Sequence, residues 1–451
     1  MLLPTLLTDL LFAGKERDAE IAVEEKNPAM AELLAGYGKA VLKKAGMGGS
    51  LRATAERTEA LRGADCVVYA GDPQAASRFF MDRSALEGEE PERPEAGEQP
   101  EGFGDREPSP LEPLVHAENL GMTDQARVNG GIEGLMHALR AGQAVTELCD
   151  AMQEACPEAL VINLGQPVAR TTEVFLRRGF ACYGLGRTPL KGANGLDTLA
   201  KRLKVRMEDQ EWEIAGLPGF SFLMKFRDRE SGKDWLPRLK KAAKENELGR
   251  LTKRWLDWWD ALPVGDVTDH AEFLPAQPDY IPEEKPEFGE TVEKRKERIL
   301  YMNTVREQGA DAREGAMAQL LLLSRVPPVR PMRLALSVLR KEDAVLEAVA
   351  HRNGGDLPQL PREAMVETNL KLVRGQPEAQ GFQVTPALAQ VMTEIDEANR
   401  LAARAAMGDR EALREYIEYD PALAGLDRLY CMDVVEQLIR MHQDLLPLYA
   451  E

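Results

Sequence analysis

A histidine with carboxylates nearby is the residue of this chain best suited to proton transfer. His270 lies in the run TDHAEFLP, residues 268–275, where Asp269 and Glu272 could orient the imidazole or raise its pKa. A histidine with a pKa near neutrality can act as a general acid or base. A structural histidine beside acidic residues is the alternative, and both interpretations stay open.

Three tryptophans in one short stretch offer a second kind of chemistry. Trp255, Trp258 and Trp259 could stack on the faces of sugar rings. Their helical spacing fits a stripe that is buried or faces another subunit better. We therefore favour a packing role for these tryptophans.

The first 160 residues alternate segments typical of helices with segments typical of strands. Strands are expected at residues 19–24, 65–71 and 159–163, and helices at 4–14, 28–45 and 132–155. Such alternation predicts a parallel sheet with helices on its faces, the doubly wound class.

Other stretches differ in composition from this pattern. Residues 87–113 are dense in Glu, Pro and Gly, which predicts a solvated insertion, with an acidic docking segment as the alternative. Residues 275–290 are a second stretch rich in Pro and Glu. Residues 385–449 are strongly helical, with breaks at Gly408-Asp409 and at Asp420-Pro421.

Composition excludes several classes of protein. The 451 residues carry a formal net charge of −18 with a pI near 5.0, so no nucleic-acid partner is expected. The five cysteines show no CxxC spacing, as expected of free thiols in a reducing compartment. No apolar run of membrane-spanning length and no signal peptide are visible, and we expect a cytoplasmic protein that does not bind membranes.

Four stretches, in order, carry a resemblance to a known family. They are LVINLGQP (160–167) followed by Thr171-Thr172-Glu173, YGLGR (183–187), AGLPGFSFL (215–223) and TDHAEFLP (268–275). They are similar to "N-x-x-N-P", "x-G-L-C", "A-G-x-N-H-x-x-F-x-L" and "T-E-S-S-x-H-x-x-E-Y-x-P" of glycoside hydrolase family 4. Weaker matches lie at 129–140, 352–367 and in the helical C-terminal part, so the resemblance spans the chain.

The resemblance implies an architecture and a chemistry. The expected fold is a Rossmann-like domain over residues 1–190, with the insertion 87–113, and an α+β domain with a helical C-terminal region over 191–451. Members of the family oxidise a sugar with NAD, use a divalent cation held by a Cys and a His, and cleave the glycosidic bond by elimination. The stretch 219–226 resembles the alpha-glucosidase and alpha-galactosidase branch. Asn163 and Gln166 match the substrate-binding motif.

The chain departs from the family at its start. The family begins with a strand and a "G-G-G-S" turn, whereas Met1 falls just before Pro4-Thr5-Leu6-Leu7, which matches the helix that follows. The first strand and glycine-rich loop are thus expected to be missing, which should expose two strand edges. A true loss and a polypeptide that extends upstream of Met1 both stay open. Glu24 is the candidate for holding the ribose hydroxyls.

The metal ligands also differ from those of the family. The Cys position is occupied by Gly186 and the His position by Gly219, and glycine has no side chain to bind a metal. A divalent metal is therefore not expected, while NAD binding stays open. Arg187 could replace the cation, because a guanidinium can stabilise an oxyanion. Arg187 and His270 are the catalytic candidates.

These observations lead to two hypotheses. The first is a divergent family 4 homologue of carbohydrate metabolism that lacks the metal-dependent activity and acts as a scaffold, a partner subunit or a ligand sensor. The alternative is an NAD-dependent glycosidase that uses Arg187 or carries a further N-terminal segment. Expected partners are a sugar or glycoside and either copies of the same chain or an intact family member.

Overall fold

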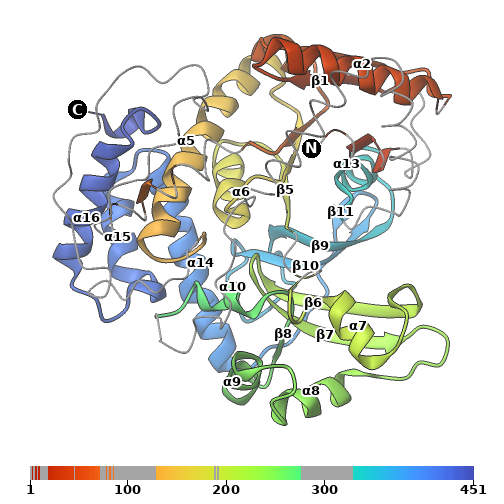
Figure 1. Cartoon of the computed structure of the whole chain (residues 1–451), viewed down its shortest axis with the longest axis vertical. Helices are drawn as coiled ribbons and strands as arrows, with labels where there is room; N and C mark the ends of the chain where they lie inside the picture. The colour runs from red at the N-terminus through yellow and green to blue at the C-terminus, as the bar shows by residue number, and fades with distance from the viewer. Residues whose placement is uncertain are drawn as a thin grey trace, which may run out of the picture.

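A computed structural model gives the arrangement of most of the chain (Figure 1). It describes residues 19–44, 46–71, 128–186, 192–275 and 329–450, with single residues at 3, 6, 7, 9, 10, 78, 81, 82, 85 and 189.

Within these ranges, nine strands form one sheet in the order β3-β4-β5-β9-β10-β6-β7-β8, with β11 paired to β10. The strands β3, β4 and β5 are parallel, and the pairs from β5 onward are antiparallel. The bounds are β3 (Cys66–Tyr69), β4 (Leu160–Asn163), β5 (Cys182–Leu185), β6 (Gln210–Leu217), β7 (Phe220–Asp228), β8 (Leu262–Pro263), β9 (Ala344–Arg352), β10 (Met365–Val373) and β11 (Gln376–Pro377).

The parallel part forms because short apolar runs alternate with long helices. All four residues of β4 are buried. The helix α5 (Gly131–Ala155) connects β3 to β4, and α6 (Val168–Arg177) connects β4 to β5. Such crossover helices are what parallel neighbours require. The predicted doubly wound class is confirmed.

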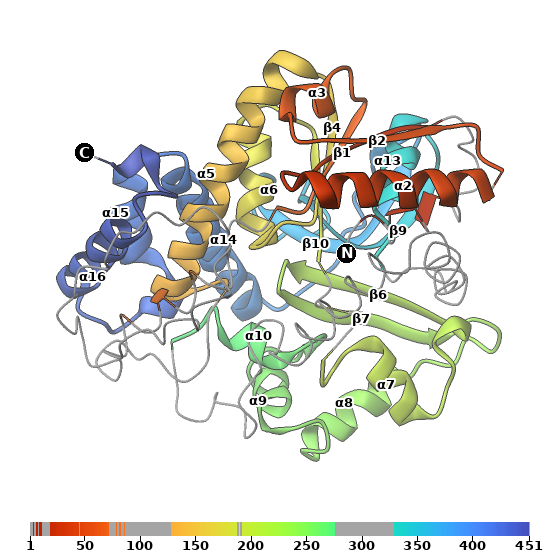
Figure 2. The same cartoon turned by 45° about the horizontal axis from the view of Figure 1, so that its top comes forward.

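A second, smaller sheet lies beside the first. β1 (Glu20–Glu24) and β2 (Ser50–Thr54) form a parallel pair, and α2 (Pro28–Lys44) connects them and packs on them (Figure 2). The short helix α3 (Arg57–Leu61) leads from β2 to β3 and packs against β1 and α5. Among the described residues, no strand joins the two sheets. Within the described ranges, β1 and β3 each pair on one side only, and the expected loss of a strand between them stays a prediction.

The second half of the chain adds helices around the antiparallel strands. They are α7 (Leu196–Leu203), α8 (Leu236–Lys244), α9 (Arg250–Trp259), α10 (Val267–Ala271) and α13 (Pro331–Leu339). Three further helices, α14 (Pro386–Ala406), α15 (Arg410–Tyr419) and α16 (Arg428–Met441), share a buried core with α5. The predicted breaks are confirmed, since α14 ends before Gly408 and α15 ends before Asp420.

The large sheet continues across the predicted domain boundary at residue 190, because β5 pairs with β9. The two-domain division stays a prediction. The insertion 87–113 lies outside the described residues. None of the helices in the described ranges combines the length and apolarity that a bilayer crossing requires.

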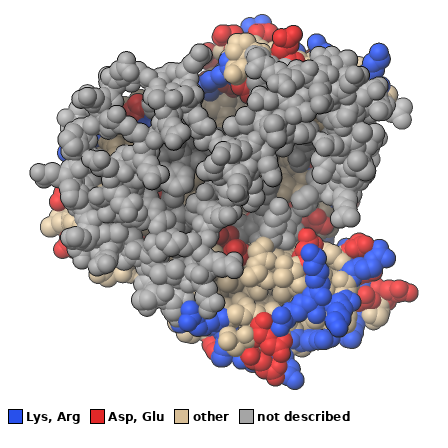
Figure 3. Space-filling model, in the orientation of Figure 1, with Lys and Arg blue, Asp and Glu red and all other residues tan. Residues whose placement is uncertain are grey.

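Charges of both signs alternate on the described surface around the β6–β7 hairpin, α7 and α8 (Figure 3). Several of them form ion pairs, such as Lys225 with Glu211 at 2.6 Å and Arg202 with Glu247 at 2.6 Å. The lysines and arginines on this surface are therefore interleaved with acidic residues.

Candidate functional site

The predicted substrate residues lie where β4 leads into α6. The buried Asn163 amide donates to the hydroxyls of Thr171 and Thr172, both at 2.8 Å, and accepts from the Gly165 N–H at 2.8 Å. Asn163 therefore stabilises the turn, and both N–H groups of its amide are already in use. Gln166 is exposed at the same turn and has a side chain that solvent can reach. Their substrate role stays a prediction.

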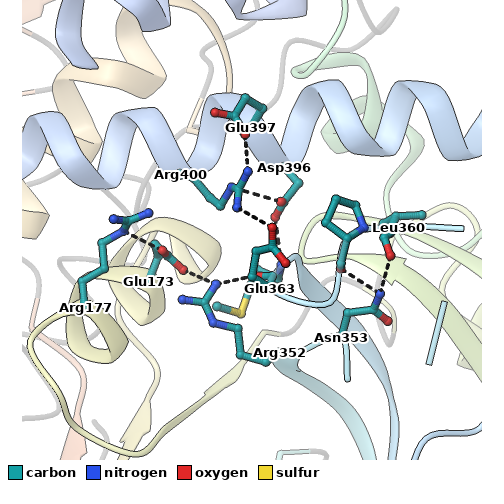
Figure 4. A network of polar contacts seen from close by, with 11 residues as sticks. Glu173, Arg177, Arg352, Asn353, Leu360, Glu363, Asp396, Glu397 and Arg400 are labelled. Carbon is teal, nitrogen blue, oxygen red and sulfur yellow. Dashed lines mark hydrogen bonds and ion pairs between the residues drawn. The ribbon is translucent and has the colours of Figure 1, made fainter. Parts of the chain in front are cut away.

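A network of charges ties α6 to the second half of the chain (Figure 4). The buried Glu173 lies 2.6 Å from Arg177 Nε and 2.6 Å from Arg352 Nη1. On α14, Asp396 lies 3.5 Å from Arg400 Nε, and burial raises the pKa of Asp396 to about 6. Each of these arginines has an acidic partner, so the network supports packing of α6, β9 and α14 rather than binding of an anion.

His270 on α10 is fully buried. Its Nε2 lies 2.9 Å from the Ser221 carbonyl oxygen and its Nδ1 lies 3.2 Å from the Asp266 carbonyl oxygen. The rings of Phe220 and Phe222 pack on the imidazole at 5.1 and 5.3 Å between centroids. Both ring nitrogens thus face backbone carbonyls, which suits a histidine that fixes α10 to β7. Its catalytic role stays a prediction.

The expectation that neighbouring carboxylates raise the pKa of His270 is wrong. Burial lowers the pKa of His270, although the surrounding carbonyls oppose this. Glu272 is engaged elsewhere, since its Oε2 accepts from the Val128 N–H and from both the backbone and side-chain amides of Asn129 at 2.9–3.0 Å. Burial and the charge of Glu272 raise the pKa of Asp269 to about 8. The sequence could not show that desolvation outweighs proximity here.

Gly186, at the end of β5, faces a carboxyl group that the site prediction did not include. A Cβ added to Gly186 would lie 3.3 Å from Glu367 Oε1, and, apart from its chain neighbours, no other described residue has an atom within 4 Å. Glu367 lies on β10 and is fully buried, and burial raises its pKa to about 8. Among the described residues its Oε1 has no hydrogen-bond partner. A small side chain at Gly186 would therefore meet only one carboxylate oxygen.

The other oxygen of Glu367 explains how this acid is held. Its Oε2 lies 2.6 Å from Ser221 Oγ, which lies 3.0 Å from the Leu217 carbonyl oxygen. A serine hydroxyl has one proton to donate. If Ser221 donates to Leu217, a protonated Glu367 can donate to Ser221, so the geometry agrees with the raised pKa of Glu367.

Gly219 lies in the turn between β6 and β7 and is much more confined. Its φ is +83°, a conformation that residues with a Cβ rarely adopt. An added Cβ would lie 3.3 Å from the Phe273 ring and 3.5 Å from Asn129 Nδ2. Phe273 belongs to the buried aromatic cluster of Phe220 and Trp259. The core therefore occupies the space next to Gly219.

The described residues do not provide a metal site at these two glycines. No group of three or more His, Cys, Asp or Glu side chains that could hold a metal ion occurs in the described ranges. The described side chains around Gly186 and Gly219 thus do not fit a divalent cation. The expectation that the chain binds no divalent metal stays a prediction, because the undescribed residues include 187 and 188 beside Gly186 as well as 86–127 and 276–328.

The structure describes the cofactor candidate Glu24 but not the second catalytic candidate, Arg187. Glu24 ends β1, and its carboxylate accepts from Arg57 Nε at 3.1 and 3.3 Å. It would have to leave Arg57, or share it, to accept ribose hydroxyls. Arg187 lies outside the described residues. Both roles stay predictions.

The tryptophan stripe agrees with the packing interpretation. Trp255 and Trp259 are buried and stack at 5.1 Å between centroids with an interplanar angle of 18°. Trp258 is 55% exposed. Two of the three rings therefore belong to the core between α9 and β7, where a sugar cannot reach them.

Similarity to known proteins was compared in three ways. The family described as "Family 4 glycosyl hydrolase" matches residues 115–183, and its C-terminal domain matches residues 214–423. An alpha-glucosidase of Erwinia rhapontici is 25% identical over 228 residues, 51% of this chain and 44% of the relative. The chain thus matches less than half the length of this curated relative.

Solved structures share the fold over nearly the whole chain. A 6-phospho-alpha-glucosidase from gut microorganisms, in complex with NAD and Mn²⁺, is 15% identical with a TM-score of 0.69, covering 98% of this chain and 95% of that one. A putative glucosidase, LplD, from Bacillus subtilis is 19% identical with a TM-score of 0.68, covering 96% of both chains. The described sheet order, the ordered motifs and these matches agree, and the chain belongs to family 4 of the glycosyl hydrolases.

Proposed function

We propose that this family 4 homologue has no metal-dependent glycosidase activity and serves carbohydrate metabolism as a non-catalytic scaffold, partner subunit or ligand sensor. The observation that carries the proposal is the surroundings of Gly219. A histidine there would need a left-handed backbone, and its Cβ would press on the Phe273 ring. The packing around Gly219 therefore supports the proposal that no histidine ligand is present there.

The surroundings of Gly186 support the same proposal in a weaker way. Glycine offers no thiolate, and the carboxyl of Glu367 is the described group nearest to the vacant side-chain position. A buried carboxyl with a raised pKa is neutral at pH 7, so it does not supply the negative charge of a metal ligand there.

NAD is the cofactor to test, because the similar 6-phospho-alpha-glucosidase structure contains it. In this chain, ribose binding at Glu24 would compete with Arg57. Binding of NAD without turnover is compatible with a sensor.

The test is a paired measurement on the purified chain. Manganese and NAD are titrated by calorimetry, and release of nitrophenol from nitrophenyl alpha-glucoside, alpha-galactoside and their 6-phosphates is followed with both present. We expect no manganese binding and no turnover. Turnover that requires NAD and manganese would overturn the proposal.

The control for the alternative enzyme is Arg187→Ala. Turnover that requires NAD but not manganese, and that is lost in Arg187→Ala, would support a glycosidase that uses this guanidinium. A native pull-down separates the non-catalytic roles, because a partner subunit should recover a family member with an intact Cys and His. Recovery of this chain alone would exclude the partner-subunit role.

A further inference from the structure

Four helices meet around a buried arginine. The helix α6 packs on α5 and α14, and α14 also packs on α15 (Figure 1). Arg170 lies on α6 and is only 2% exposed. Its Nε donates to Asn399 Oδ1 at 2.8 Å, and its Nη2 donates to Tyr416 Oη at 3.2 Å. Its Nη1 is also buried and has no hydrogen-bond partner among the described residues. One donor of this guanidinium is therefore still available.

Arg170 also differs from the other buried arginine of this core in its charge balance. Arg140 donates to both carboxylate oxygens of Asp82, at 3.1 and 2.7 Å. In the described part of the chain, no carboxylate forms an ion pair with Arg170, and its partners Asn399 and Tyr416 are neutral. The guanidinium carbon lies 5.2 Å from the centroid of the Tyr416 ring. Such a cation–π contact offsets only part of the cost of burying an unpaired charge.

The acid that acts on Tyr416 does not supply the missing charge. Asp420 helps to raise the pKa of Tyr416, after the larger effect of burial. Its Oδ2 accepts from the Gly131 N–H at 2.7 Å, and its Oδ1 accepts from the Ala422 N–H at 3.0 Å. Asp420 therefore serves the backbone at the start of α5 and forms no ion pair with Arg170.

His137 on α5 links the two arginines. Burial, followed by the charges of Arg140 and Arg170, lowers the pKa of His137 to about 3, although Asp82 opposes this. Both guanidinium groups therefore lie near the same imidazole, which stays neutral at pH 7. Because Asp82 balances Arg140, these four side chains, here called the Arg170 cluster, keep one unbalanced positive charge. His137 is only partly buried, so solvent reaches the cluster at this residue.

The chemistry of the Arg170 cluster selects the kind of ligand. A buried donor without a partner is normally explained by a water or an ion. Water would accept from Nη1 but would leave the charge unbalanced. A polyatomic oxyanion would bring several oxygens, each of which needs a donor once it is buried. Among the described atoms of the cluster, the buried donors without a partner are Arg170 Nη1 and Arg140 Nε. A monatomic anion fits this small number of donors.

We propose that the Arg170 cluster binds a chloride ion at Arg170 Nη1. The ion supplies the missing negative charge and accepts a charge-assisted hydrogen bond from the guanidinium. Arg170 joins α6 to Asn399 of α14 and to Tyr416 of α15. Chloride therefore stabilises the junction between the sheet and the C-terminal helices.

The first test is urea unfolding of the 451-residue chain at constant ionic strength, with chloride replacing gluconate. Constant ionic strength removes the general screening effect of salt. Once chloride exceeds its dissociation constant, the ratio of folded to unfolded chain should rise about tenfold for each tenfold increase in chloride. Arg170→Gln should lose this dependence. Arg206→Gln removes an arginine whose side chain is 72% exposed, and this matched control should keep the dependence.

A direct measurement covers the case in which Arg170→Gln does not fold. Crystals of the natural chain are grown with bromide in place of chloride, and the anomalous scattering of bromide locates the ion. A peak within hydrogen-bonding distance of Arg170 Nη1 is expected.

Four outcomes would overturn the proposal. The first is an unfolding midpoint that does not depend on chloride, and the second is an equal dependence in Arg170→Gln. The third is a crystal without a bromide peak at Arg170, or with a peak but no chloride dependence in solution, because the ion would then bind only at crystal concentration. The fourth is stabilisation by phosphate at lower concentrations than chloride that is lost in Arg170→Gln, which would identify an oxyanion site.

Discussion

Replacing Glu367 by glutamine should change how stability depends on pH. The carboxyl is buried, and its pKa rises from 4.5 to about 8 on folding. Between these values the unfolded chain has released the proton while the folded chain keeps it. The free energy of unfolding therefore falls as the pH rises through this window, and the loss levels off above the folded pKa.

The magnitude follows from linkage. One group contributes about 1.4 kcal/mol per pH unit between its unfolded and folded pKa values. From pH 5 to pH 8 the contribution of Glu367 is on the order of 4 kcal/mol. Glutamine has nearly the same shape and does not ionise, so Glu367→Gln should lose this slope and be more stable than the natural chain at pH 8.

The assay is urea unfolding followed by circular dichroism at pH 5, 6, 7 and 8. Asp269 and Asp396, whose pKa values are also raised, act in the same direction but are present in both proteins and cancel in the comparison. Glu347→Gln, on an exposed position of the neighbouring β9, removes the same charge and is the control. Parallel pH profiles for the natural chain and Glu367→Gln would refute a protonated carboxyl beside Ser221.

Three substitutions test other parts of the structure by urea unfolding. Asp82→Asn should destabilise the chain by about 3–5 kcal/mol, because it leaves the buried Arg140, now 2.7 Å from Asp82 Oδ2, without its counter-charge; a loss below about 1 kcal/mol would contradict this. Gly219→Ala should lower the free energy of unfolding by about 1–2 kcal/mol, because the φ of this residue is +83°. Gly186→Ala should lower it by less, because only one carboxylate oxygen must shift. Equal losses for the two variants would contradict this difference. Asp409→Ala should cost about 1 kcal/mol, since its Oδ1 accepts from two N–H groups at the start of α15; an unchanged unfolding midpoint would contradict the cap.

The elements with strong local signals were predicted from the sequence. The near-continuous apolar run that became β3, the helical period of α5, and the turn residues Gly408 and Asp420 each act within a few neighbours along the chain. The strand β2 was missed. Its sequence, Ser-Leu-Arg-Ala-Thr, buries only Leu51, so neither a continuous apolar run nor a strict alternation marks it.

The site depended on contacts between distant segments, and less of it could be predicted. The resemblance to the family predicted that Gly186 and Gly219 occupy its two ligand positions. It could not show Glu367 beside Gly186, because that contact arises only when β10 pairs with β9, which itself pairs with β5. The low pKa of His270 was missed for a similar reason, since burial by Phe220 and Phe222 depends on how α10 packs on β7.

The two replaced ligand positions differ in what a side chain would meet, and this bears on the proposed role. A Cβ at Gly186 would need only a small movement of Glu367 Oε1. A Cβ at Gly219 would need an unfavourable backbone and a shift of the Phe273 ring, which packs on Phe220 at 5.8 Å between centroids. Returning the histidine would therefore disturb the core that also holds His270 and Trp259. The proposed loss of metal chemistry therefore rests more on Gly219 than on Gly186.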